Sequence, residues 1–220
     1  MRFLITAFEP FGKYSYNPSA ALLELLSKQG KEVRNANQYE KNIKSEIIPV
    51  LLPTSYSRAA KILSDSIDKY HPDCAFLLGL AGGRKAVSLE FVALNVKAAD
   101  IPDNDGELAD GSSVIPDKSN ALFTTLPLGK MAAYIREQGN VPCNVSYHAG
   151  TYVCNSTYFN LLCSGIPGCF IHIPFDERSV EIASSEAAFI PLDDSLKAVT
   201  MAIEYIECHS DEIQATEVKR

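Results

Sequence analysis

The sequence lacks the features that mark several large classes of protein. Its 220 residues contain 20 lysines and arginines against 27 aspartates and glutamates, so the formal net charge is −7 at pH 7. Without a basic excess, a nucleic-acid-binding surface is not expected, because phosphate contacts need clustered Lys and Arg. The apolar run at residues 1–8 is too short to span a membrane or to form the core of a secretion signal, and Glu9 follows it. We therefore expect a cytoplasmic protein with neither nucleic acid nor membrane as a partner.

Cysteine motifs for metal binding or disulfide frameworks are missing as well. The sequence has no Cys-x-x-Cys pair and no histidines at zinc-finger spacing. We interpret its six cysteines as reduced thiols, most of them small buried residues. They are Cys74, Cys143, Cys154, Cys163, Cys169 and Cys208.

What the sequence does contain is an alternation of strand and helix patterns. Apolar β-forming runs predict strands at 2–8, 45–52, 74–79, 89–96, 143–148 and 169–173. Helical spacing predicts helices at 19–26, 57–70, 128–138, 152–163 and 193–209. Several strands are almost wholly apolar, which indicates a sheet covered on both faces. We predict that residues 1–220 form one domain, an α/β/α sandwich around a mostly parallel, twisted sheet.

Two polar stretches, residues 28–42 and 100–118, are predicted to be loops. The second is rich in Asp, Gly, Pro and Ser, and a loop of its length in a compact domain is often a lid or a partner contact.

Three residues in separate motifs carry candidate chemistry. Cys154 falls at the start of a predicted helix, where the positive end of the helix dipole would lower the thiol pKa. His172 lies at the carboxyl end of an apolar strand, in the position of a base. Glu90 is embedded among apolar residues and needs a partner, so it is a candidate to orient His172 while His172 takes the proton from Cys154.

Each of these residues also has a plain structural interpretation. Cys154 is equally consistent with core packing, and His172 with a histidine satisfied by a backbone carbonyl. His148 is a competing base because it lies close to Cys154 in sequence. The HPDC run at 71–74 is interpreted as a turn and a buried thiol, and Cys208-His209 has neither an acid nor turn geometry to support a catalytic role.

Two segments near predicted strand ends suggest binding surfaces. The run GLAGGRK at 79–85 lacks the spacing of either GxGxxG or the P-loop, so a tight turn is the favoured interpretation. Phe8 and Phe11 lie just past the first strand, where they are either core residues or one wall of a small apolar pocket.

Taken together, several segments resemble the pyroglutamyl peptidase I family of cysteine exopeptidases, also called pyrrolidone carboxyl peptidases. FEPFG, NPS, GLAGGR, LEFVALN, IPDN, AGTYVCN and FIHIP occur in the order and near the spacing of that family, over nearly the whole chain. The resemblance implies a single α/β/α sandwich that removes an amino-terminal pyroglutamyl residue from peptides, without a cofactor or metal, and that commonly assembles as a tetramer.

The resemblance also implies roles for individual residues. Glu90, Cys154 and His172 match the catalytic positions of the family, one in each motif. Aromatic positions that enclose the lactam ring in the family are matched by Phe8, Phe11 and Tyr152, with Asn17 and Val153 nearby.

The sequence departs from the family pattern in three places. Phe91 follows the matched glutamate where an arginine is common in the family, and Asp100 precedes the IPDN motif where an arginine is also common. After His172-Ile173-Pro174 the sequence continues with FDER instead of the family's Tyr-containing stretch of the PEQ type. These changes raise an alternative function, a non-catalytic or altered-specificity binder of lactam-ended peptides. A third class, a nucleoside phosphorylase with a similar sandwich, would need a basic phosphate site and base-stacking residues. The GLAGGRK segment alone is not enough evidence for that function.

Overall fold

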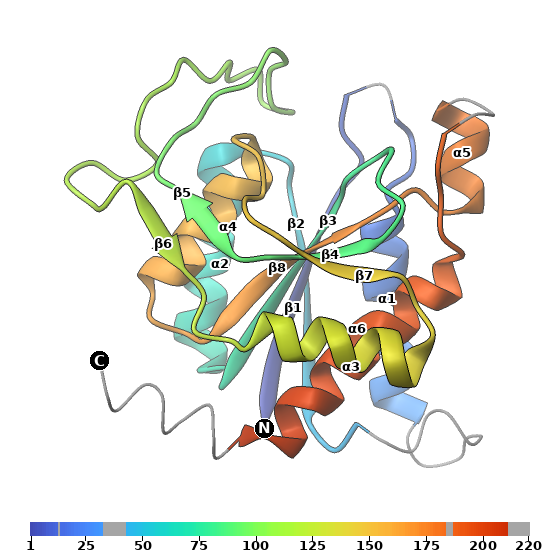
Figure 1. Ribbon diagram of the computed structural model, residues 1–220. Coiled ribbons are helices and arrows are strands. Elements are labelled where there is room, and N and C mark those ends of the chain that lie inside the picture. The colour runs from blue at the N-terminus through green and yellow to red at the C-terminus, as the bar shows by residue number, and fades with distance from the viewer. Residues whose placement is uncertain (13, 33–42, 184–186, 211–220) are drawn as a thin grey trace.

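The computed structural model describes residues 1–12, 14–32, 43–183 and 187–210 and has a six-stranded sheet at its centre (Figure 1). The strands lie in the order β2-β1-β3-β8-β4-β7. Neighbouring strands run parallel except β8 and β4, which are antiparallel. The strands are β1 (Arg2–Phe8), β2 (Glu46–Leu52), β3 (Cys74–Leu80), β4 (Val87–Glu90), β7 (Cys143–Ser146) and β8 (Gly168–Ile173).

Helices cover both faces of this sheet, which confirms the predicted fold class (Figure 1). One face carries α1 (Pro18–Glu32), α3 (Leu128–Gly139) and α6 (Leu192–Cys208), and the other carries α2 (Tyr56–Tyr70) and α4 (Val153–Cys163). A short helix, α5 (Glu177–Ala183), follows β8. Among the helices of the described residues, none combines the length and the apolar character needed to cross a bilayer.

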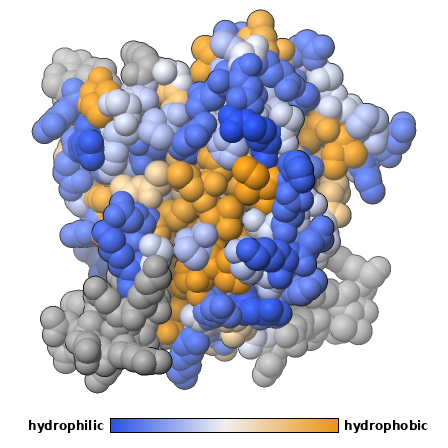
Figure 2. All heavy atoms as spheres, turned by 180° about the vertical axis from the view of Figure 1, so that it is seen from behind, coloured by the Kyte–Doolittle hydropathy of each residue, from blue (hydrophilic) through white to orange (hydrophobic). Residues whose placement is uncertain are grey.

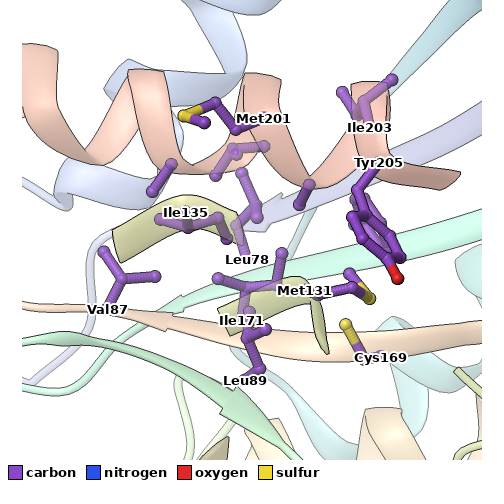
Figure 3. Close-up of a cluster of buried hydrophobic side chains, with 14 of the residues drawn as sticks. Leu78, Val87, Leu89, Met131, Ile135, Cys169, Ile171, Met201, Ile203 and Tyr205 are labelled. Carbon is purple, nitrogen blue, oxygen red and sulfur yellow. The ribbon is translucent and has the colours of Figure 1, made fainter. Parts of the chain in front are cut away.

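Two apolar cores fill the space between the sheet and its helices. Figure 3 shows part of the first, in which Leu78, Leu89 and Ile171 of the sheet meet Met131 and Ile135 of α3. All five are fully buried. The second core lies on the opposite face, under α2 and α4. Side chains that alternate along β3 and β8 thus point into different cores, which explains why these two strands are largely apolar on both faces. In β4, Val87 and Leu89 enter the first core, whereas Ser88 and Glu90 lie on the opposite face.

The amino-terminal ends of α1 and α2 are capped by the residues that directly precede these helices. Asn17 precedes Pro18, and its Oδ1 accepts a hydrogen bond from the Ser19 backbone N–H at 3.1 Å. Proline at the first helical position has no N–H that the helix would leave unpaired. Ser55 caps α2 in the same way by accepting from the Arg58 N–H.

The structure corrects the predicted strand at 89–96. The chain leaves the main sheet at Phe91 and continues as β5 (Val92–Leu94), which pairs with β6 (Ala121–Phe123) in a separate two-stranded sheet. The Phe91 N–H still bonds to Ser146 of β7, but its carbonyl accepts from Thr124 beyond β6. The Phe91 ring packs 5.5 Å from the ring of Phe123, and this contact favours the change of sheet.

Other element boundaries differ from the prediction in smaller ways. Helix α1 continues through residues 28–32, which were predicted as loop, and the rest of that predicted loop, 33–42, lies outside the described residues. Strand β6 and helix α5 were not predicted because each is short. Residues 100–118 contain neither a helix nor a strand, as predicted.

Candidate active site

A cavity of about 270 Å³ lies at the sheet edge where β1, β3 and β8 end. These three strands are parallel, so their carboxyl ends meet at one edge, the usual position for sites in open α/β sheets. The cavity contains both Cys154 and His172. Its lining residues are Phe8, Phe11, Asn17, Thr54, Leu80, Ala81, Arg84, His148, Ala149, Gly150, Tyr152, Val153, Cys154 and His172.

Cys154 enters the cavity from the first turn of α4. Gly150, with a φ of +79°, makes the turn that brings the chain from β7 to this helix, and Tyr152 is the N-cap residue. On the facing strand β3, a Cβ at Gly79 would lie 3.2 Å from Cys154 Sγ and 2.6 Å from a ring carbon of Phe170. Glycine at position 79 therefore leaves the space that the thiol occupies.

The imidazole of His172 is held by Glu90, which lies deeper in the sheet. His172 Nδ1 and Glu90 Oε1 are 2.6 Å apart. Their strands are antiparallel, with His172 opposite Ser88 and Glu90 opposite Phe170, so the two side chains are diagonal neighbours on one face. Glu90 is fully buried and His172 is 4% exposed. His172 therefore forms part of the cavity wall, and Glu90 lies behind it.

Arg84 and Tyr158 complete the surroundings of Glu90. An Arg84 guanidinium nitrogen lies 2.7 Å from the same Oε1 atom that contacts His172. The Tyr158 hydroxyl donates to the Glu90 backbone carbonyl at 2.8 Å. A buried carboxylate without a counter-charge is costly, and the Arg84 guanidinium supplies a positive charge that offsets its desolvation.

These contacts set the resting protonation states. Burial opposes ionisation of Glu90, but its interaction with His172, hydrogen bonding with Ser146 and the Arg84 charge together outweigh burial and lower the pKa of Glu90. Burial lowers the pKa of His172 below its ordinary value of 6.5, although Glu90 opposes that shift. At neutral pH an ionised Glu90 therefore accepts a hydrogen bond from Nδ1–H of a neutral His172, which leaves Nε2 as the free basic nitrogen.

The expectation of a lowered thiol pKa at Cys154 is wrong for the free protein. Burial raises the pKa of Cys154 to about 12, and the Glu90 charge adds to that effect. The backbone N–H of Cys154 and the Arg84 charge oppose the shift but are smaller. The thiol is thus neutral at rest, and it needs a base when it reacts.

Aromatic rings form the far wall of the cavity. Phe11 packs against Tyr152 with ring centroids 6.1 Å apart, and Tyr152 packs edge-on against Tyr56 at 5.7 Å. Phe8 is buried and stacks at 6.2 Å on Phe170. The Tyr152 hydroxyl donates to the Pro102 carbonyl at 2.9 Å, which ties this wall to the 100–118 loop.

The two remaining predicted binding residues also line the cavity. Val153 is fully buried and contributes apolar surface beside Cys154. Asn17 already uses its amide group in the fold, because Nδ2 donates to the Glu9 carbonyl and Oδ1 caps α1. These two hydrogen bonds explain the asparagine at position 17 without a contact to a ligand.

The rival histidines and cysteines have different surroundings. His148 lines the same cavity, but its Nδ1 accepts from the Gly150 N–H at 3.2 Å instead of facing a carboxylate. His71 closes the end of α2 in a left-handed conformation. Cys74 is buried in β3, and His209 stacks on Tyr205 beyond the end of α6. Of the four histidines, His172 alone has a carboxylate partner within the described part of the chain.

Arg84 is a site residue that sequence reasoning missed. The segment that holds it was interpreted as a tight turn, and the Arg84 N–H does bond back to the Ala81 carbonyl at 3.3 Å. The signal for its role was present in the sequence, because a carboxylate among apolar residues needs a cation and Arg84 lies six positions before Glu90.

The departures from the family pattern lie away from the cavity lining. Asp100 is exposed, and the charges that act on the Cys154 pKa are those of Glu90 and Arg84. Phe91 marks the sheet change and faces Phe123 and Tyr147. The FDER stretch places Asp176 where it accepts a hydrogen bond from the Tyr16 hydroxyl at 2.5 Å, which ties it to the loop that carries Phe11.

Comparison with known proteins finds similarity to pyroglutamyl peptidases over nearly the whole chain. A family model described as pyroglutamyl peptidase matches residues 1–209. A pyrrolidone-carboxylate peptidase of Thermosipho melanesiensis is 35% identical over 186 residues, which cover 82% of this chain and 86% of that protein. The pyrrolidone-carboxylate peptidase 1 of Caldanaerobacter subterraneus is 34% identical over 94% of this chain and 98% of its own length.

Solved structures of pyroglutamyl peptidases also resemble this chain. Pyroglutamyl peptidase I of Bacillus amyloliquefaciens superimposes with a TM-score of 0.82 at 31% identity, over 92% of this chain and 95% of that one. The pyrrolidone carboxyl peptidase of Thermococcus litoralis gives a TM-score of 0.84 at 27% identity, over 96% and 95% of the two chains. The chain therefore belongs to the pyroglutamyl peptidase family.

Proposed function

We propose that this protein is a cysteine exopeptidase that hydrolyses the amino-terminal pyroglutamyl residue from peptides. In this proposal Cys154 is the nucleophile, His172 is the general base and acid, and Glu90 positions His172. The observation that carries it is the presence of a thiol and a carboxylate-bound imidazole in one cavity, in a chain of this family.

The reaction begins with proton transfer from a neutral thiol. His172 Nε2 takes the Cys154 proton as Sγ attacks the pyroglutamyl carbonyl carbon, and the carbonyl oxygen becomes an oxyanion. The first N–H groups of α4 have no carbonyl within the helix to bond, so they are available to stabilise that oxyanion. His172 then gives the proton to the leaving amine as the C–N bond breaks, and a thioester remains on Cys154.

Water completes the cycle. His172 removes a proton from a water molecule that attacks the thioester, and the proton passes to the Cys154 sulfur as pyroglutamate leaves. Glu90 stays ionised throughout and stabilises the imidazolium that forms twice in each turnover.

The cavity suits a neutral five-membered lactam. Its far wall is aromatic, and none of the described residues that line it is acidic. An amino-terminal proline has a similar ring but carries a positive charge, which this cavity would have to desolvate without a counter-charge.

Steady-state kinetics with a pyroglutamyl and a prolyl aryl amide test this assignment. We expect kcat/KM for the pyroglutamyl amide to exceed that for the prolyl amide by at least about 100-fold, since an unpaired buried charge costs several kcal/mol. Similar values for the two substrates would contradict it. Tight binding of pyroglutamyl peptides without release of amine would favour the binder alternative.

Two further expectations stay predictions: a cytoplasmic location and assembly into a tetramer. Figure 2 shows apolar surface gathered in the middle of one face of the molecule, with polar residues around it. A contiguous apolar area with a polar rim is typical of a subunit interface, so this face supports the proposal that copies of the chain associate.

A further inference from the structure

A second cavity, of about 520 Å³, lies beside the first. Arg84 and His148 line both cavities, so the two meet at these residues. The second cavity is lined by Arg84, Lys85, Ala86, Ser88, Asn144, Val145, Ser146, Tyr147 and His148.

The sheet leaves this region open because α4 does not extend over it. Helix α4 packs on β3, β5, β6 and β8, whereas β4 and β7 form the end of the sheet. Ser88 is opposite both His172 of β8 and Asn144 of β7, so all three lie on the same face of the sheet. This face of β7 carries small polar residues, and Asn144 is exposed. The result is a polar surface that continues from His172 toward solvent.

The charge of this second cavity differs from that of the whole chain. The protein has a net charge of −7, yet Arg84, Lys85 and His148 line the cavity, and its lining within the described part of the chain includes no acidic side chain. Arg84 uses one nitrogen on Glu90 and keeps further N–H donors, with 32% of its side chain exposed. His148 Nδ1 accepts from Gly150, so the proton of its neutral form is on Nε2 and can be donated.

We propose that this second cavity binds the peptide segment that follows the scissile bond, and that it favours a carboxylate within the first two residues after pyroglutamate. The inference rests on the proposed function, because the lactam in the first cavity sets where the rest of the peptide must leave. In this proposal the peptide leaves the first cavity where Arg84 and His148 line both cavities, and its next residues, at about 3.3 Å each in an extended chain, lie in the cavity that Lys85 lines. Lys85 is exposed and supplies the positive charge for that carboxylate.

Matched peptides separate the possible sources of the carboxylate. One set is pyroglutamyl-alanyl-X-alaninamide, with X as glutamate, glutamine or lysine, and the other is pyroglutamyl-alanyl-alanine with a free or an amidated carboxyl terminus. We expect kcat/KM to be about two- to five-fold higher for glutamate than for glutamine, the range of an exposed ion pair, and lowest for lysine. A similar gain for the free over the amidated terminus would show that the terminal carboxylate is also recognised.

Substitution of Lys85 provides the decisive comparison. Lys85→Gln is expected to reduce the glutamate-to-lysine preference, and Lys85→Glu to reverse it. Because the readout is a ratio of substrates within one protein, a general loss of activity does not affect it. Lys61→Glu is the matched control, since Lys61 is an exposed lysine of α2 that pairs with Asp65 and lines neither cavity. Its substrate ratio should remain that of the wild type.

Two outcomes would overturn the inference, and they can be told apart. If the wild type cleaves all the peptides and the pyroglutamyl aryl amide without a charge preference, or if Lys85→Glu leaves the preference unchanged, only the second-cavity assignment fails. If no pyroglutamyl substrate is cleaved, the proposed function fails and this inference fails with it.

Discussion

Glu90 shows at the residue scale how one buried charge organises the site. It is fully buried, and the same oxygen, Oε1, contacts both His172 and Arg84. Because the pKa of Glu90 is lowered, it remains an acceptor at neutral pH and holds the Nδ1–H form of His172. The unpaired state of this carboxylate would be costly, so its two partners serve stability as well as orientation.

Replacing Glu90 with glutamine should remove this orientation while keeping the shape. The glutamine amide can donate to Nδ1, which would move the imidazole proton to Nε2 and block the base. We expect kcat to fall by about 10²–10⁴-fold with a nearly unchanged KM, as when a base loses its orienting carboxylate. Circular dichroism would verify the fold. A kcat within about threefold of the wild type would show that Glu90 is structural only.

The pH dependence of kcat/KM follows from the resting protonation states. His172 must be neutral to accept the thiol proton, and burial lowers its pKa, so activity should persist below pH 6.5 and fall as His172 becomes protonated at still lower pH. Cys154, with a pKa of about 12, should not produce an acidic limb. A pH–rate profile with its acidic midpoint above 6.5 would contradict a neutral thiol–imidazole pair.

At the element scale, a buried carboxylate is one of the groups that fix the 100–118 loop to the site. Asp103 is 5% exposed and accepts backbone N–H bonds from Tyr56, Asp105 and Glu107, each at 2.9 Å. The loop thereby joins the first turn of α2 and presents the Pro102 carbonyl to Tyr152. A long loop without regular structure can thus hold one wall of the cavity.

Removing the Asp103 side chain should loosen that wall. Asp103→Ala leaves three N–H groups without their acceptor, and we expect the free energy of unfolding to fall by about 2–4 kcal/mol. KM for a pyroglutamyl amide should rise several-fold, while kcat stays within about threefold because Cys154 and His172 are held by other elements.

Asp105→Ala is the control for that variant, because it changes the same loop at an exposed ion pair with Arg58. Its KM should match the wild type. Thermal melts and steady-state kinetics on both variants would show whether Asp103 stabilises the loop and positions Tyr152. An unchanged KM in Asp103→Ala would show that the loop does not position Tyr152.

At the scale of the whole molecule, local patterns predicted the elements but not how they meet. The runs at 2–8 and 169–173 predicted β1 and β8 nearly to the residue because both strands are buried on both faces. The break at Phe91 was missed because it depends on a ring contact with Phe123, far away in sequence. Local periodicity contains no information about such a contact.

The candidate trio illustrates the same limit. Residue chemistry suggested Glu90, Cys154 and His172 as a trio, and the family resemblance matched the same three residues, but neither shows how far apart they lie in the fold. Their proximity follows from the strand order β3-β8-β4 and from the antiparallel β8–β4 pair, which brings Glu90 diagonally behind His172. The raised pKa of Cys154 was likewise not predictable, since it results from burial by segments distant in sequence.

The most direct test of the central claim is the rate of amine release from a pyroglutamyl aryl amide by the wild type, Cys154→Ala and Cys163→Ala. The two cysteines lie at opposite ends of α4 and both are partly exposed, so the second variant controls for loss of a thiol from that helix. We predict that the wild type and Cys163→Ala turn over at similar rates and that Cys154→Ala loses at least about 10⁴-fold in kcat. Turnover by Cys154→Ala at a rate near that of the wild type would contradict the assignment of Cys154 as the nucleophile.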